Sequence, residues 1–558
     1  MNFMAIDNQL FSICEDQGFI ELIAHLQPKY IIPSRRFFSD KMLPQAYKTL
    51  QALVFENISM AQYLSFTTDI WTNSYTNDSF ISLSCHYIGN DFNKVDCVLN
   101  CKHFPESHTG INIAAIFETM LTEWQIPESK IHLVIRDAAA NMKLGVELSN
   151  IDSISCFLHG LQLVLKDAVF SQKTVAEIIK RSKSICTHFN HSSLSTVQLK
   201  RIQKEIDPKL PENRILLPIQ DVATRWNSTF LMLERIEKLK RPLQLFIADH
   251  PNIPVLTSSD WKYIENILYL LQPFFMITES ISKTKSLIST VIPHVRALNG
   301  YLSSIAEEDL GVKKLKNGLR NALKDRFLNA IKSNYNVFES RIFVVSTSLD
   351  PRYKNTLFPE NTKKNLRTWL FSEVKKIVIA DSKDSNDSGS SSDHSSPERK
   401  KAKTNAKQTE SNISSIIRSR IAENFLKFYK HEEIDTTCRE GAKSKNNKKI
   451  SKVDDNIQLE IEHYLSEGII KIDDEPNPEI KVLQWWKENA IRFPNLSNTA
   501  RKFLAAPASS VYSERFFSEA GNVFEERRAR LLPKTGEQLL FLHHNLLKFL
   551  EVCNKIIE

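Results

Sequence analysis

Glu514 is the side chain of this sequence whose position most directly suggests chemistry. It follows a serine pair that is expected to begin a short helix, and helical spacing puts Val511, Phe517 and Ser518 on its face. An ionised carboxylate on such a packed face is costly unless a metal ion, an arginine or a backbone donor holds it. The alternative is a first-turn glutamate that is favoured by the helix dipole or paired with Arg515.

Two aspartates stand at the ends of stretches that read as β-strands. Asp69 lies in a Thr-Thr-Asp-Ile-Trp-Thr sequence, and Asp137 follows the short apolar run at residues 131–135. If the two strands are neighbours, their end carboxylates share a cleft with room for Glu514, and a pair of Mg²⁺ ions about 4 Å apart there suits phosphodiester transfer. The alternative for each aspartate is an ordinary turn or cap residue.

The elements that must position these acids follow a recognisable order. β-Branched and aromatic residues predict strands, and apolar spacing of three and four predicts helices. The order is three strands, a helix, a strand, a helix and a strand, as in an RNase H-like α/β sheet, where the first and fourth strands are adjacent. The predicted strands are residues 63–70, 80–88, 96–103, 131–135 and 153–157, and the predicted helices are residues 111–124 and 161–170.

The remainder of the chain reads as mainly helical. Segments such as 230–247, 261–282 and 457–464 show helical periodicity, and a final helix is expected at about residues 535–557. Two polar, charge-rich stretches cannot bury enough apolar surface to order themselves. We therefore divide the chain into an N-terminal helical segment (1–58), a first sheet part (59–170), a helical insertion (171–480) with disordered linkers at about 381–412 and 439–455, and a C-terminal region (481–558).

The amino-acid sequence around Glu514 resembles a motif of a known family. Ser-Ser-x-x-Ser-Glu-Arg-x-Phe-Ser-x-x-Gly-Asn, followed by Arg-x-Arg-Leu, is similar to the C-terminal signature of hAT-superfamily transposases, and looks most like the BED-type zinc finger proteins derived from them. The resemblance implies an Asp-Asp-Glu set in which Glu514 is the third catalytic carboxylate. Asp69 matches the first motif. Asp137 matches the second, although Ala138 replaces its usual asparagine, which puts full activity in doubt.

Other family elements resemble parts of the DNA-handling machinery. Cys-Phe-Leu-His at residues 156–159 matches an element whose histidine, here His159, works near the DNA end; as a zinc half-site it is weak. Thr-Arg-Trp-Asn-Ser at residues 224–228 matches an element whose tryptophan stacks on a base, which makes Arg225 and Trp226 candidates for DNA contact. Arg515 is a further candidate. A buried tryptophan under an arginine is the alternative, and residues 346–353 read as structural.

A C-terminal dimerisation region is also implied. Gln-Trp-Trp-Lys at residues 484–487 opens it, and one face of the last helix carries an apolar stripe. Packing inside a single subunit would leave the same stripe. The candidate dimerisation residues are Trp485, Trp486, Leu539, Leu542, Leu546 and Leu550. The expected fold class is thus α/β plus α: an RNase H-like mixed sheet interrupted by a large all-helical insertion, with C-terminal hAT dimerisation helices.

Composition and charge narrow the cellular compartment and the kinds of partner expected for this protein. The chain has 558 residues, a 42% hydrophobic content and a net charge of +8. No apolar run reaches the length of a membrane span, no secretory signal is evident, and the eight cysteines show no disulfide spacing, so we expect a protein of a reducing compartment without a membrane partner. Basic runs at residues 399–403 and 443–452 suit nuclear import or phosphate contact, or are simply a solvated linker.

Two functions follow from the resemblance, and a third from composition alone. The first is a domesticated nuclear homodimer, or higher oligomer, that associates with DNA and regulates transcription. The second is an active DNA transposase that uses Mg²⁺ or Mn²⁺ at Asp69, Asp137 and Glu514. The third is a dimeric protein-interaction scaffold. The DNA-reading BED finger needs two cysteines and two histidines upstream, and only Cys14 precedes Cys85, so no zinc finger site is expected in this chain. The missing finger and Ala138 favour the first function, although a truncated gene model would explain the missing finger equally well.

Overall fold

The computed structural model describes most of the chain. Backbone and side chains are described for residues 1–222, 225–282, 286–304, 311–329, 336–380, 452–471, 478–524 and 531–549, and the backbone alone for the helical residues 381–384 and 550–557. The basic run at 399–403, residues 443–451 of the second run and most of the two expected linkers lie outside these ranges. Among the described helices, none is both long and apolar enough to cross a membrane.

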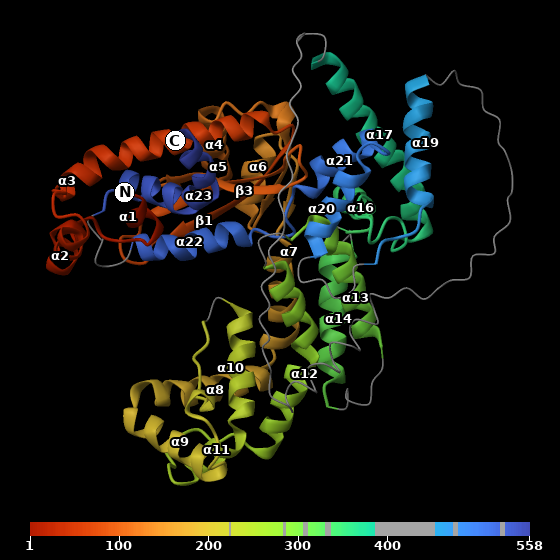
Figure 1. The fold of residues 1–558 in the computed structure, drawn as a ribbon. Coiled ribbons are helices and arrows are strands. Elements are labelled where there is room, and N and C mark those ends of the chain that lie inside the picture. Colours follow the sequence, from red (N-terminus) through yellow and green to blue (C-terminus); the bar gives the residue numbers. More distant parts are fainter. Residues whose placement is uncertain are drawn as a thin grey trace.

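A five-stranded mixed sheet forms the centre of one lobe. Its strand order is β3-β2-β1-β4-β5, with the first three strands antiparallel and β4 and β5 parallel to β1 (Figure 1). The adjacency of the first and fourth strands, predicted from the order of elements, is confirmed. The strands are β1 (Leu64–Thr72), β2 (Ser79–Ile88), β3 (Lys94–His103), β4 (Ile131–Arg136) and β5 (Ser153–Ser155).

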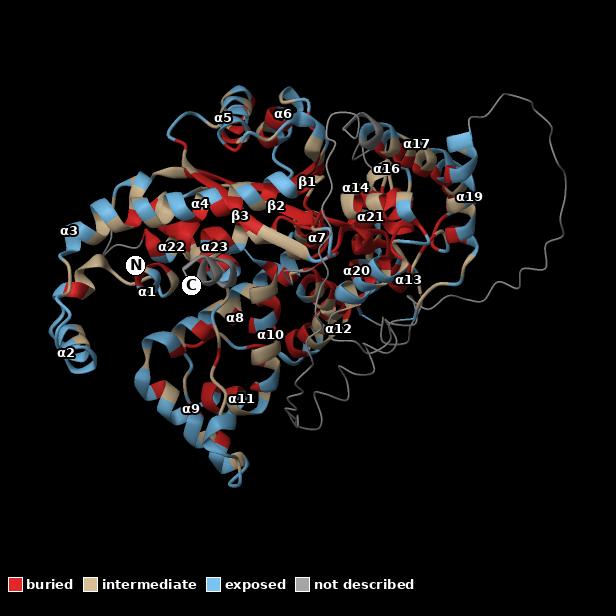
Figure 2. Ribbon diagram, turned by 45° about the horizontal axis from the view of Figure 1, so that its top comes forward, coloured by how far each residue is buried: buried red, intermediate tan, exposed pale blue. Residues whose placement is uncertain are grey.

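Helices from both ends of the chain cover this sheet. Figure 2 shows α5 and α6 on one side of the sheet and α22 on the other, while α23 lies along β3 and α4. The N-terminal helix α1 packs on α23, so the two ends of the chain meet in the same lobe (Figure 1). These helices are α1 (Asn2–Ile6), α2 (Gln17–Leu26), α3 (Arg35–Phe37), α4 (Leu43–Met60), α5 (Gly110–Glu123), α6 (Ala140–Leu148), α22 (Val511–Val523) and α23 (Pro533–Ile557).

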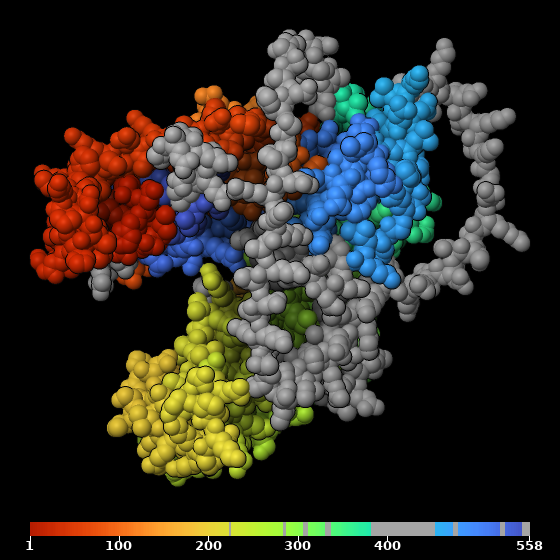
Figure 3. Space-filling view, in the orientation of Figure 1, coloured from red at the N-terminus to blue at the C-terminus, as the bar shows by residue number. Residues whose placement is uncertain are grey.

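The described part of the chain between β5 and α22 is helical. Figure 3 shows that α8 to α11 form a lobe that projects away from the sheet lobe. The helices are α7 (Phe157–Leu165), α8 (Lys173–His191), α9 (Ser193–Ile206), α10 (Trp226–Lys238), α11 (Lys240–Ala248), α12 (Ser258–Ile281), α13 (Val291–Ser303), α14 (Lys313–Phe327), α16 (Arg341–Ser348), α17 (Glu360–Asp384), α19 (Lys452–Ser466), α20 (Pro478–Asn489) and α21 (Pro494–Leu504).

Some expected boundaries need correction. The fifth strand ends at Ser155 rather than at residue 157, because Phe157 begins α7 and turns into the core instead of continuing the ladder. Helix α17 continues to Asp384 and α19 begins at Lys452, so the outer ends of both expected linkers are helical. The core-facing apolar residues of these helices extend to Val378 in α17 and begin at Ile457 in α19, so core packing anchors each helix next to these ends.

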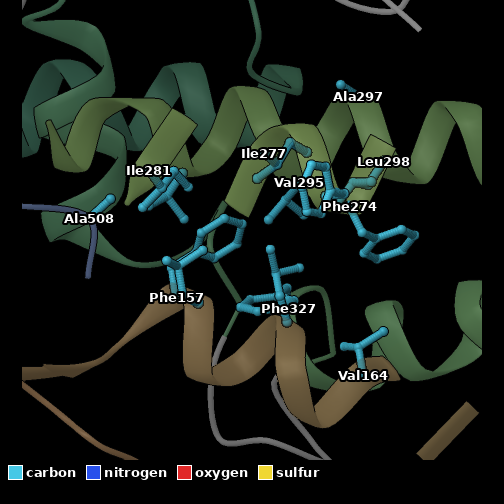
Figure 4. Close-up of a cluster of buried hydrophobic side chains, with 14 of the residues drawn as sticks. Phe157, Val164, Phe274, Ile277, Ile281, Val295, Ala297, Leu298, Phe327 and Ala508 are labelled. Atoms are coloured by element: carbon cyan, nitrogen blue, oxygen red, sulfur yellow. The ribbon is translucent and has the colours of Figure 1, made fainter. Parts of the chain in front are cut away.

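A hydrophobic core joins the sheet lobe to the insertion. Phe157 of α7 packs on Phe327 of α14, with ring centroids 5.1 Å apart, and α12 and α13 close the cluster from above (Figure 4). Gly160 is required at this contact, since a Cβ there would lie 2.6 Å from the Phe327 ring. The first turns after β5 are therefore anchored by apolar residues of the insertion.

Candidate functional site

Asp69 lies inside β1, three residues before its end, and Asp137 is the first residue after the neighbouring strand β4. In the parallel pairing of β1 with β4, Thr67 lies opposite Ile135, and each aspartate stands two residues further along. Because side chains two residues apart on a strand share a face, Asp69 projects to the same side of the sheet as Thr67. The two acids thus lie near each other towards the C-terminal ends of the neighbouring strands β1 and β4.

Helix α22 brings Glu514 to the same side. The Ser513 hydroxyl donates a hydrogen bond to Thr67 Oγ1 over 3.0 Å, which fixes the first turn of α22 against β1. The expected face of this helix is wrong in part: Ser518 is exposed and Glu514 lies at the margin of the buried face, which Ser513, Phe516, Phe517, Ala520 and Val523 form instead. The rotation follows from Phe517 stacking on Trp71 of β1.

The three carboxylates influence one another electrostatically. Burial, followed by the charges of Asp137 and Glu514, raises the pKa of Asp69 to about 7. Burial also raises the pKa of Glu514, and the positive charges of Arg225 and His159 partly oppose that rise. The site is therefore a concentration of negative charge with two cationic side chains at its Glu514 side.

The donor set suits a hard divalent cation. Asp69 and Asp137 accept backbone hydrogen bonds from Ile70 and Ala139, over 2.9 and 3.2 Å, through one oxygen each. Carboxylate oxygens are what Mg²⁺ and Mn²⁺ prefer, and the raised pKa of Asp69 marks negative charge that a cation would relieve. The ligand oxygens of the three acids do not all lie within 4.8 Å of one another, so they do not form a closed shell around a single ion in this structure.

Cys156 holds the helix that carries Glu514 in place. Its thiol accepts a hydrogen bond from the backbone N–H of Ser510, the residue that caps α22, over 3.3 Å. The neighbouring Phe157 N–H donates to Ala508 O over 3.3 Å. These bonds connect the end of β5 to the turn before α22 across more than 350 residues of sequence. Cys156 therefore has a structural partner, while His159, one turn on, lies on the Glu514 side.

Arg225 and Trp226 take separate roles in the structure. Trp226 is 7% exposed and packs on Phe230 and Phe275, while Arg225 is exposed. This environment matches the alternative interpretation, a buried tryptophan next to an arginine. One edge of Trp226 still lines a cavity of about 520 Å³, together with Lys166, Lys180 and Lys183. Thr224 of this motif lies outside the described residues, and Arg515 is exposed on α22.

The candidate dimerisation residues with described side chains lie inside one subunit. Trp486 is fully buried and donates from Nε1 to Leu349 O over 2.7 Å, and Trp485 stacks on Phe493. The stripe on α23 faces α4, β3 and α1 rather than solvent, with Leu539, Leu542 and Leu546 at most 7% exposed. Leu550 lies in α23, with its side chain outside the described residues. The three leucines of the stripe with described side chains therefore pack inside the subunit.

Sequence reasoning missed a buried polar chain beneath the site. Thr67 Oγ1 lies 3.0 Å from His86 Nε2, and His86 Nδ1 lies 2.6 Å from Asp96 Oδ1. A neutral His86 with its proton on Nδ1 satisfies both contacts, and burial lowers the pKa of this histidine. With the Ser513 hydroxyl, the chain joins α22, β1, β2 and β3. The signal in the sequence was the one histidine of β2, a strand of apolar and serine residues.

Three family models match this chain. They are the ZBED1 RNase-like domain at residues 67–154, the ZBED1 RNase-like helical domain at residues 154–270, and the hAT family C-terminal dimerisation region at residues 460–546. The first contains Asp69 and Asp137, the second contains Trp226, and the third contains Glu514. The elements that carry the site therefore fall within the regions that define these families.

Curated proteins match over most of the chain. Zinc finger BED domain-containing protein 4 from Homo sapiens is 24% identical over 97% of this chain and 43% of its own length. A putative AC transposase from Zea mays is 25% identical over 95% of this chain and 62% of its own length, and a putative transcriptional regulator, tpeD, from Talaromyces stipitatus is 25% identical over 95% and 59%. The chain spans about half the length of the relatives it matches. From these matches and the motifs above, the chain belongs to the hAT superfamily of transposases and transposase-derived proteins, together with the BED-type zinc finger proteins.

Proposed function

We propose that this chain is a domesticated hAT transposase derivative that associates with DNA in the nucleus as a homodimer and takes part in transcriptional regulation. One observation carries DNA association: the Arg225 guanidinium and the His159 imidazole lie close enough to Glu514, beside the carboxylate cluster, to act on it electrostatically. Cations placed beside a metal-type site can draw a phosphate backbone towards it. The proposed fold is an RNase H-like sheet that the helical insertion interrupts and α22 completes.

A second basic feature supports DNA association. Lys166, Lys180 and Lys183 line the cavity that Trp226 edges, and Lys183 pairs with Asp221 over 2.9 Å. Lysines attract the phosphates of nucleic acid, while an accessible aromatic edge offers contact to a base. A phosphate-and-base surface on the insertion would let the protein hold DNA next to the sheet lobe.

Nuclear location and regulation are supported by relatives and sequence. The matched proteins include one named as a putative transcriptional regulator and others named as putative transposases. The basic runs at 399–403 and 443–452 have the composition of nuclear-import signals. A tagged full chain should accumulate in nuclei, and replacing both basic runs with neutral residues should release it to the cytoplasm.

Dimerisation is supported by the matched C-terminal region at residues 460–546. Because Trp486 and the three leucines of the α23 stripe with described side chains are buried, we expect a dimer to use other surface. Ile491 is 95% exposed and Ile480 is 41% exposed within the same region. We expect a dimer in light-scattering chromatography that Ile491→Glu weakens, whereas Leu542→Ala lowers the melting temperature instead.

Salt-dependent DNA binding tests the proposal. Wild-type protein should bind duplex DNA with an affinity that falls steeply as salt rises, and Lys166→Glu with Lys180→Glu should weaken it and flatten the salt slope. Lys48→Glu, a matched change on exposed α4, should bind as wild type. Failure of the wild type to bind any duplex at low salt would contradict DNA association and leave a protein-interaction scaffold.

A second candidate function is DNA transposition, which the convergence of Asp69, Asp137 and Glu514 favours. These acids would hold Mg²⁺ or Mn²⁺, which when bound would activate an attacking water or 3′-hydroxyl and stabilise the leaving oxygen. The chain itself would fix the acids through Thr67, Ser513 and Cys156 and would steer phosphate with Arg225. Ala138, exposed beside Asp137, supplies no polar group there.

Cleavage of labelled duplexes that carry candidate terminal inverted repeats separates the two functions. A transposase should nick them only with Mg²⁺ or Mn²⁺, and Asp69→Asn or Glu514→Gln should abolish nicking. Binding without cleavage by the wild type would leave the regulator.

A further inference from the structure

Three metal-ligand side chains meet on the side of α22 away from the carboxylate site. Glu519 of α22 lies opposite His543 and His544 of α23, and its Oε2 is 2.9 Å from His543 Nε2 and 3.1 Å from His544 Nε2. One ligand atom from each residue lies within 4.8 Å of the other two. In the part of the chain that the structure describes, no other group of three or more such side chains meets this condition.

The two imidazoles are held in a ligand-like arrangement. His543 donates from Nδ1 to Ala5 O over 2.9 Å, which directs its Nε2 towards Glu519. A backbone carbonyl bound to the far ring nitrogen is the usual support of a metal-binding histidine. His544 Nε2 is buried and makes no hydrogen bond, although Glu519 is close.

The types of the three ligand atoms indicate which metal ion they would bind. Two imidazole nitrogens and one carboxylate oxygen suit Zn²⁺, whose ligands stand 2.0–2.2 Å from the ion, so tetrahedral neighbours are about 3.3–3.6 Å apart. The present spacings of 2.9 and 3.1 Å need to open by only a few tenths of an ångström. Glu519 is 42% exposed in its side chain, which leaves a route for the ion and a place for a water as fourth ligand.

We propose that Glu519, His543 and His544 bind one Zn²⁺ ion that clamps α22 to α23. The ion would join the helix that carries Glu514 to the last helix and, through His543 and Ala5, to the first. Lys548 is the nearest competing cation, and its ammonium group donates to Asp96 O over 2.8 Å and to the Tyr512 hydroxyl, away from the three ligands. A plain ion pair between Glu519 and protonated histidines is the competing explanation.

Metal titration of the full chain tests this site. Metal-free protein titrated with ZnCl₂ in a calorimeter should bind one ion that His543→Asn and Glu519→Gln each weaken by at least about tenfold. His543→Asn keeps a donor near the position of Nδ1 and removes Nε2, so the Ala5 contact can persist. His463→Asn, at a surface histidine 3.6 Å from Glu467, is the matched control and should bind as wild type.

Two further measurements keep the outcome clear. Co²⁺ in place of Zn²⁺ should give the visible bands of a tetrahedral site without thiolate charge transfer, which separates it from cysteine binding. Zn²⁺ should raise the melting temperature of wild type and of Asp69→Asn, but not of folded His543→Asn or Glu519→Gln, whose fold circular dichroism checks. Equal Zn²⁺ affinity in all variants, or no binding by the wild type, would overturn the proposal.

Discussion

Two aspartates of this protein, the buried Asp350 and the half-buried Asp69, differ in how neighbouring groups balance their charge. Asp350, at the end of α16, is fully buried, and its carboxylate accepts hydrogen bonds from Ser289 Oγ over 2.7 Å, from the Arg352 N–H over 3.1 Å and from the Arg352 guanidinium over 2.9 and 2.7 Å. Asp69 accepts one backbone hydrogen bond and faces two more carboxylates. Arg352 balances the charge of Asp350, whereas no cationic side chain among the described residues balances the charge of Asp69.

The difference separates a structural acid from a candidate functional acid. Asp350 joins α16 to the loop before α13, as expected for the structural segment 346–353, and its charge is matched inside the protein. Asp69 has a raised pKa because no cationic side chain offsets its burial. An acid left in this state is a candidate for binding something from outside, since the protein keeps it at a cost to stability.

Removing the structural acid should have the largest effect on stability. Asp350→Asn leaves the buried Arg352 without a countercharge, and we expect a loss of about 3–5 kcal/mol in the free energy of unfolding. Urea denaturation measures it. Asp69→Asn is the matched change and should cost nothing or stabilise the fold. A similar loss in both variants would break the distinction between the two acids.

The pH dependence of stability should reveal the functional acid. The folded pKa of Asp69, about 7, lies above its ordinary 3.8, so between these values the folded state holds more protons than the unfolded state and stability falls as pH rises. Asp69→Asn should therefore gain about 1–2 kcal/mol over wild type between pH 4 and pH 8, once solvent screening is allowed for. A constant difference across this range would contradict the raised pKa.

Loss of one neutral donor should be milder. Ser289→Ala removes one hydrogen bond to Asp350 and leaves the Arg352 pair, so we expect a loss of about 1–2 kcal/mol in the free energy of unfolding. Ser466→Ala, at an exposed helix end, serves as the control in the same urea titration. If Ser289→Ala lowered the free energy of unfolding as much as Asp350→Asn, Arg352 would not be the main partner of Asp350.

The smallest stability effect is expected beside the functional acid. Ala138→Asn restores the usual family residue at an exposed position, so the free energy of unfolding should change by no more than about 0.5 kcal/mol. If the cluster binds divalent cations, the added amide should strengthen Mn²⁺ affinity. A variant that unfolds more easily without any change in Mn²⁺ affinity would count against a cation site beside Asp137.

Local patterns predicted the sheet well. Alternating β-branched residues and the short apolar run at 131–135 located β1 to β4, and the order of elements placed Asp69 next to Asp137. The patterns that predict strands are local in sequence. The order of strands and helices then leaves few possible arrangements of the sheet. The distance of Glu514 along the chain did not prevent its assignment, because its motif is specific.

Contacts between distant segments were not predictable. The apolar stripe of α23 and the two tryptophans read equally as interface or core, and only the fold decides that Leu542 and Trp486 are core. The face of α22 depends on Trp71, far away in the sequence. The Glu519 cluster with His543 and His544 likewise joins two helices, so no spacing rule indicates it.

Mn²⁺ binding followed by paramagnetic resonance tests the central claim most directly: that Asp69, Asp137 and Glu514 form a carboxylate cluster that holds divalent cations. Measured in a His543→Asn background to remove the second proposed site, wild-type acids should bind Mn²⁺, and Asp69→Asn or Glu514→Gln should each weaken it at least about tenfold. Asp350→Asn, if folded, should leave it unchanged. Mn²⁺ binding that is absent, or equal with and without Asp69 and Glu514, would contradict the account.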